Sequence, residues 1–141
     1  MKKFEFRLQK LFEIRDRKEK EIKNKLGYLI KVQKQEEEEK KILINDLKRK
    51  DYNYRKNFLF SDFNISEALS HENFSRVNCK KIQNLEIKKK DMDLKIKRIK
   101  KNLLEASIQK KVVEKIKDKK IKEYSQDLKK REDFLYGGTG L

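Results

Sequence analysis

The chain has 141 residues, of which 45% are charged and 35% hydrophobic, and it contains neither Trp nor Pro. This composition supplies too little apolar material for a thick globular core, but enough for the narrow apolar seam of a coiled coil. The formal net charge of +16 predicts attraction to something acidic, such as nucleic acid, an anionic membrane or an acidic protein. The lone cysteine, Cys79, cannot form an intramolecular disulfide and fits a reducing cytoplasm.

The first predicted element is a long helix over about residues 4–57. Apolar residues recur there at helical steps, as in Phe4, Leu8 and Leu11. Polar side chains fill several expected seam positions, so we expect an imperfect seam, at Arg15, Lys18, Gln33, Glu36 and Lys40. Within the acidic run 35–41, the spacing predicts that Glu36 pairs with Lys40 and Glu37 with Lys41 along the helix.

The helical pattern stops in the segment NFLFSDFNIS, residues 57–66, which predicts a turn over about 58–65. We expect Phe58 and Phe60 to plug the tip of the resulting hairpin. Asn64, followed three residues later by Glu67, resembles a capping box that begins the next helix. A single turn between two long helices makes them antiparallel.

The second predicted helix covers about residues 66–136 and has the clearer heptad pattern, with Lys89 and Lys110 at two seam positions. Its apolar seam residues are Ile82, Leu85, Met92, Ile96, Ile99, Leu103, Ala106 and Val113. After a slip in phase the stripe continues at Ile121, Tyr124, Leu128 and Leu135. We therefore predict an all-α fold, a single antiparallel coiled-coil domain over 1–136 with a flexible tail at 137–141. The longer second helix is expected to overhang where the termini meet.

No constellation of residues predicts catalysis. A zinc site built on His71 and Cys79 lacks the four ligands of a structural site. The sequence contains no glycine-rich phosphate loop, so we expect no enzyme activity, cofactor, metal or small-molecule substrate.

The basic segment 88–101 spreads its Lys and Arg around the helix, which favours a solvated face over a nucleic-acid-binding surface. A structural coiled-coil spacer and a basic nucleic-acid-binding coiled coil remain alternatives. The charged N-terminus argues against a signal peptide, and no run reaches the roughly 18 apolar residues of a membrane span.

The opening segment 4–21, FEFRLQKLFEIRDRKEKE, resembles the start of the FliJ family, which belongs to the bacterial flagellar type III export apparatus. That family typically begins F-x-F-R-L-x-x-L-L-x-x-R followed by Lys and Glu. Segment 73–82, NFSRVNCKKI, is similar to the family's region after the turn, and segment 119–134 to its closing charged helix. The chain departs from the family pattern at Asn78, where an apolar residue is usual, and at Lys81, where a small one is usual.

The resemblance implies a non-catalytic, two-helix stalk that acts with other proteins. Its expected partners are a hexameric flagellar export ATPase, the cytoplasmic domain of an export-gate membrane protein, and export chaperones. The residues implied to bind the ATPase are Phe6, Arg7, Leu8, Leu11 and Arg15. Those implied to bind the gate are Phe74, Val77, Asn78 and Lys81. The implied location is the cytoplasm, peripheral to the inner membrane at the flagellar base.

Overall fold

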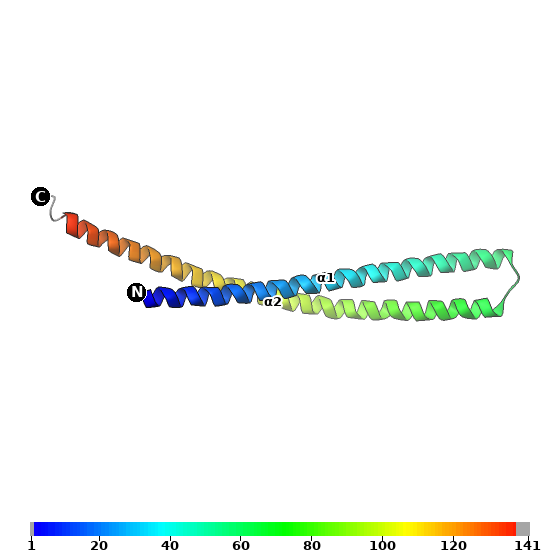
Figure 1. Ribbon diagram of the computed structural model, residues 1–141. Coiled ribbons are helices and arrows are strands. Elements are labelled where there is room, and N and C mark those ends of the chain that lie inside the picture. Colours follow the sequence, from blue (N-terminus) through cyan, green and yellow to red (C-terminus); the bar gives the residue numbers. More distant parts are fainter. Residues whose placement is uncertain (1, 138–141) are drawn as a thin grey trace. The chain divides into compact units, whose positions relative to one another are not determined.

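The computed structural model describes residues 2–137 and consists there of two long helices, α1 (Lys2–Phe60) and α2 (Ile65–Gly137). Figure 1 shows the chain reversing between them, with the two helices side by side. The all-α helical hairpin predicted from the sequence is confirmed. The tail predicted at 137–141 lies, apart from Gly137, outside the described residues.

Contacts between α1 and α2 establish the antiparallel pairing, because residues later in α1 contact residues earlier in α2. Arg15 bonds Gln109 near the termini, whereas Glu37 pairs with Lys89 nearer the turn. These contacts group into two compact units, each described here by itself. The terminal unit contains Met1–Asn24 and Ile99–Leu141, and the turn unit contains Lys25–Arg98.

The connection between the helices is shorter than the sequence predicted, because α1 continues through Phe58, Leu59 and Phe60. The hydroxyl of Ser61 donates to the Asn57 carbonyl at 2.5 Å and so satisfies a carbonyl at the end of α1. The Asn64 side chain accepts from the Ser66 amide at 3.0 Å, which confirms its predicted capping role. The four-residue link 61–64 therefore reverses the chain with both helix ends partly satisfied.

The seam of the terminal unit buries Leu8 on α1 against α2, where Ala106 and Val113 are buried. In the turn unit the buried side chains are Leu85, Ile96 and Asn78. No side chain among the described residues is fully enclosed, as expected for a seam only two helices thick. Most of the buried side chains of the hairpin therefore belong to α2.

Polar residues at seam positions form bonds across the helices. Gln33 donates to the Asp93 carboxylate, and Lys40 pairs with Glu86 at 3.3 Å. Lys89 pairs with Glu37 at 2.7 Å. The pairs predicted along α1, Glu36 with Lys40 and Glu37 with Lys41, do not form ion pairs among the described residues, since Lys40 and Glu37 are both engaged by α2. The charge of Lys41 acts on Glu37 only as a weaker attraction than that of Lys89.

Candidate binding surfaces

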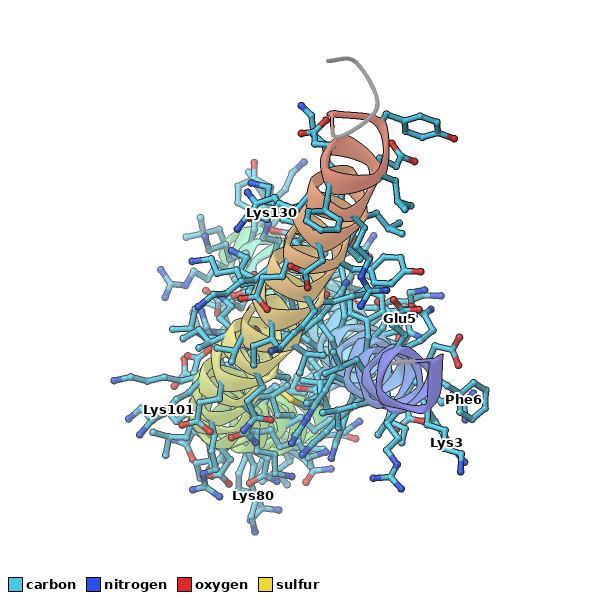
Figure 2. All side chains as sticks on the ribbon, turned by 90° about the vertical axis from the view of Figure 1, so that its left-hand side faces the viewer. Lys3, Glu5, Phe6, Lys80, Lys101 and Lys130 are labelled. Atoms are coloured by element: carbon cyan, nitrogen blue, oxygen red, sulfur yellow. The ribbon has the colours of Figure 1, made fainter. Side chains whose placement is uncertain are left out.

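Only some of the residues implied to contact an ATPase are exposed near the start of α1. Phe6 is 69% exposed and Leu11 39% exposed, and Arg7 is exposed as well. Figure 2 shows the Phe6 side chain projecting from α1 into open space. Leu8 lies instead in the seam, 9% exposed, so it supports the pairing of the helices and is not available to a partner while they stay paired.

Arg15 is half-buried and its Nη1 donates to Gln109 Oε1 at 2.6 Å. Its Nε atom is buried without a hydrogen-bond partner among the described residues. The guanidinium therefore serves first as a cross-helix contact within the hairpin. Phe6, Arg7 and Leu11 form the part of the implied set that a partner can reach, and we call them the N-terminal surface.

An ion cluster lies next to this surface. Lys110 Nζ is 2.8 Å from Asp16 Oδ1 and 3.6 Å from Glu19 Oε1, and Lys20 pairs with Asp16 at 2.9 Å. The hydrogen bond from Lys110, followed by that from Lys20, holds the pKa of the Asp16 carboxyl below its ordinary value of 3.8. The hydrogen bond to Asp16 in turn raises the pKa of Lys110. Both shifts favour the charged forms of Asp16 and Lys110, whose ion pair joins the two helices of the terminal unit.

Acid should weaken the hairpin partly through Asp16. Because the pKa of this carboxyl is lower in the folded state, its stabilisation is present above the ordinary value and is lost as the pH falls through the folded value. We expect Asp16→Asn to lose less stability than the wild type between neutral pH and about pH 3. Urea unfolding at both pH values measures this difference. The control is Asp91→Asn, an exposed carboxyl, which should behave as the wild type does.

Every described side chain in 121–136 is exposed. Gln9 accepts from Lys117, and α1 begins two turns earlier, so its first residues reach about as far as Tyr124, and Ile121 lines a hollow with Glu5 and Leu8. Beyond about residue 124, α1 has no described residues opposite α2. The apolar residues there include Ile121, 49% exposed, Tyr124, 40% exposed, and Leu128, 42% exposed. They continue the spacing of the seam, and we call segment 121–136 the C-terminal overhang.

The segment after the turn offers a mixed surface. Val77 is 42% exposed and Lys81 is exposed, so a partner can reach both. Phe74 is half-buried, and the Lys50 ammonium lies 3.8 Å from the centre of its ring. Asn78 is 8% exposed, and its Nδ2 donates to the Phe74 carbonyl at 3.0 Å. Among the residues implied to bind an export gate, Asn78 is therefore turned into the hairpin.

The tip of the hairpin differs from the sequence prediction. Phe60 is 84% exposed and Phe58 52% exposed, so the prediction that they plug the tip is wrong. Phe58 contacts the edge of Phe63, with ring centroids 6.3 Å apart, but no third element covers either ring within the described residues. Two helices that meet at a four-residue link leave no interior large enough to enclose three phenylalanines.

No group of three or more His, Cys, Asp or Glu side chains within residues 2–137 is placed to hold a metal ion. Neither α1 nor the described part of α2 contains a stretch apolar and long enough to cross a membrane.

His71 contacts two residues of α1. The ring of Tyr54 stacks on that of His71 with the ring centroids 4.2 Å apart, and His71 Nε2 lies 3.3 Å from Asp51 Oδ1. This histidine joins the helices of the turn unit.

The fold defines the class of this protein as a two-helix, coiled-coil-like antiparallel hairpin with exposed apolar side chains at the N-terminal surface, the tip and the C-terminal overhang. Comparisons with protein-family models, with curated proteins and with solved structures find no match to the chain. The residues themselves and the surfaces that the hairpin exposes are what indicate a function for this protein.

Proposed function

We propose that this protein is a non-catalytic component of a flagellar protein export apparatus, similar to the FliJ family. In this role it binds and stimulates a hexameric export ATPase as a central stalk. It also connects the ATPase to the export gate and helps to cycle export chaperones. Its location would be cytoplasmic and peripheral to the inner membrane at the flagellar base. Chemistry on ATP would belong to the partner.

The observation that carries the proposal is the opening motif on an accessible helix face. The segment FEFRL at 4–8 lies in α1, and Phe6 and Arg7 of this motif are exposed. Aromatic residues, including Phe, and Arg are both enriched at protein interfaces relative to the rest of the protein surface. The exposed C-terminal overhang belongs to the same unit and offers a second apolar contact.

The gate contact would use the surface after the turn. Val77 and Lys81 are exposed there, and part of Phe74 remains accessible beside Lys50. Asn78 is buried in the seam beneath these residues, so it would not contact the gate directly while the helices stay paired. The two proposed contact surfaces would lie in different units of the hairpin, which supports the proposed connecting role.

The experiment is to measure hydrolysis of ATP by the hexameric flagellar export ATPase of the same organism with and without this protein. We expect the double variant Phe6→Asp and Leu11→Asp to lose the stimulation, because two charges replace the exposed apolar contacts. Leu8 is left unchanged, since a charge there would disrupt the seam. The matched control is Tyr28→Asp, a similarly exposed position of α1 at 67%, which should stimulate as the wild type does.

Two results would contradict the proposal. One is stimulation by the Phe6 and Leu11 double variant equal to that of the wild type, with circular dichroism showing both proteins helical. The other is a stable parallel dimer in light scattering, which would favour a structural coiled-coil spacer, because the proposed stalk is a monomeric hairpin.

A further inference from the structure

A second row of apolar side chains runs along α2 in the terminal unit. It contains Leu104, Ile108, Val112 and Ile116, which are 62%, 53%, 51% and 41% exposed. The spacing of four residues places them one above the other on a helix. The row is separate from the seam and from the C-terminal overhang.

Leu104, Ile108 and Val112 of the row lie on the side of α2 that faces away from α1, and Ile116 lies nearer the seam. Ala106 and Val113, which are 4% and 6% exposed, mark the side that packs against α1. At about 100° per residue, Ile108 lies roughly 150° around the helix from the direction between them. A helix that is apolar on two opposite sides is ordinarily covered on both. Within the described residues α1 covers only one of them.

The row is bordered by positive charge. Lys101, Lys111, Lys115 and Lys119 are exposed and project from the same side of the helix. Figure 2 shows Lys101 pointing away from α1. None of these four lysines forms an ion pair with another residue in 2–137, in contrast to Lys110 on the opposite side, which pairs with Asp16. The nearest acidic residues, Glu105 and Asp118, lie toward the edges of this face, and Glu105 lines a hollow with Lys18 and Ile22 of α1, so the face itself is strongly basic.

We propose that this face binds an amphipathic helix with acidic flanks, which would lie along α2 as a third helix. Its apolar residues would cover Leu104, Ile108 and Val112, and its carboxylates would pair with the uncompensated lysines. A row one residue wide, made of Leu, Ile and Val, fits the groove between ridges of a partner helix. Insertion into a membrane surface requires a broader apolar face, usually with aromatic residues. A second copy of this chain would bring the same lysines together, and like charges oppose that pairing.

The probe is a synthetic helical peptide of heptads with Leu at positions a and d and Glu at e and g. Its twin carries Lys at e and g. We expect the full-length protein to bind the fluorescently labelled acidic peptide at low salt and not the basic twin, as measured by anisotropy. The double variant Leu104→Gln and Ile108→Gln should weaken this binding by about tenfold or more. Both positions are exposed, so the helical circular dichroism should not change.

Matched controls separate this face from the general positive charge of the chain. Ile87→Gln with Leu94→Gln removes two exposed apolar residues of the same helix outside the row, 59% and 61% exposed, and should bind as the wild type does. Lys111→Glu with Lys115→Glu should weaken binding more than Lys10→Glu with Lys23→Glu, which changes the net charge equally on α1.

Three results would overturn the inference. The first is acidic-peptide binding that the Leu104 and Ile108 variant leaves unchanged, since the row would then have no part in it. The second is equal binding of the basic twin. The third is absence of peptide binding together with sedimentation on vesicles of phosphatidylcholine and phosphatidylglycerol that the same variant abolishes, which would assign the face to a lipid surface. The ATPase assay reports on Phe6 and Leu11, so this inference and the proposed function can fail independently.

Discussion

Replacing Ile96 with Asp is expected to lower the free energy of unfolding by about 3–5 kcal/mol, since it puts a carboxylate where an apolar side chain is buried. Ile96 is 7% exposed and belongs to the short set of buried side chains in the turn unit. A two-helix seam has few such residues, so the loss of one is a large share of its total stability. Urea unfolding followed by circular dichroism at 222 nm measures the change.

Leu94 provides the matched control for this substitution. It lies two residues away on the same helix but is 61% exposed. Leu94→Asp introduces the same charge without burying it, and should change the free energy of unfolding by no more than about 0.5 kcal/mol. Equal effects at the two positions would contradict the assignment of Ile96 to the seam.

Replacing Asn78 with Leu is expected to raise the free energy of unfolding by about 1–2 kcal/mol. Asn78 is 8% exposed, and its amide donates to the Phe74 carbonyl of its own helix. That carbonyl also accepts the helical backbone bond, so the substitution leaves no buried acceptor unpaired. Leu would bury apolar area at a seam position that now buries an amide. The midpoint of urea unfolding should therefore move to higher concentration.

Asn84, which is exposed on the same helix, is the control for this second substitution. Asn84→Leu should leave the midpoint nearly unchanged, because no additional area is buried. A loss of stability in the Asn78 variant would show that the polar side chain fixes the register of the helices, as a single buried Asn can do in a coiled coil.

The periodicity of the sequence was sufficient for the secondary structure. Apolar residues at helical spacing and the absence of Pro allow two long helices, and Asn64 marks where the second begins. The turn was predicted three residues too early, at Phe58, because a cluster of Phe with Asn and Ser is typical of a loop. In the structure Phe58 and Phe60 remain helical, since this segment contains no Pro or Gly to end α1.

The candidate surfaces were only partly predictable. A motif identifies Phe6, Leu8 and Leu11 together, but it does not say which of them faces α2, and Leu8 proves to be buried. The row that includes Leu104 and Ile108 was readable from its spacing of four. It was missed because the stronger heptad pattern through Ala106 and Val113 accounted for the helix by itself.

The sequence alone determined that the chain forms two antiparallel helices, because helix periodicity and turn chemistry act between residues close together in the chain. Only the tertiary structure decided which charges pair and which apolar residues stay uncovered. Glu37 binds Lys89 and leaves Lys41 exposed, although Lys41 is nearer in sequence. Such choices depend on the register and rotation of one helix against the other, and these are set by all the seam contacts at once.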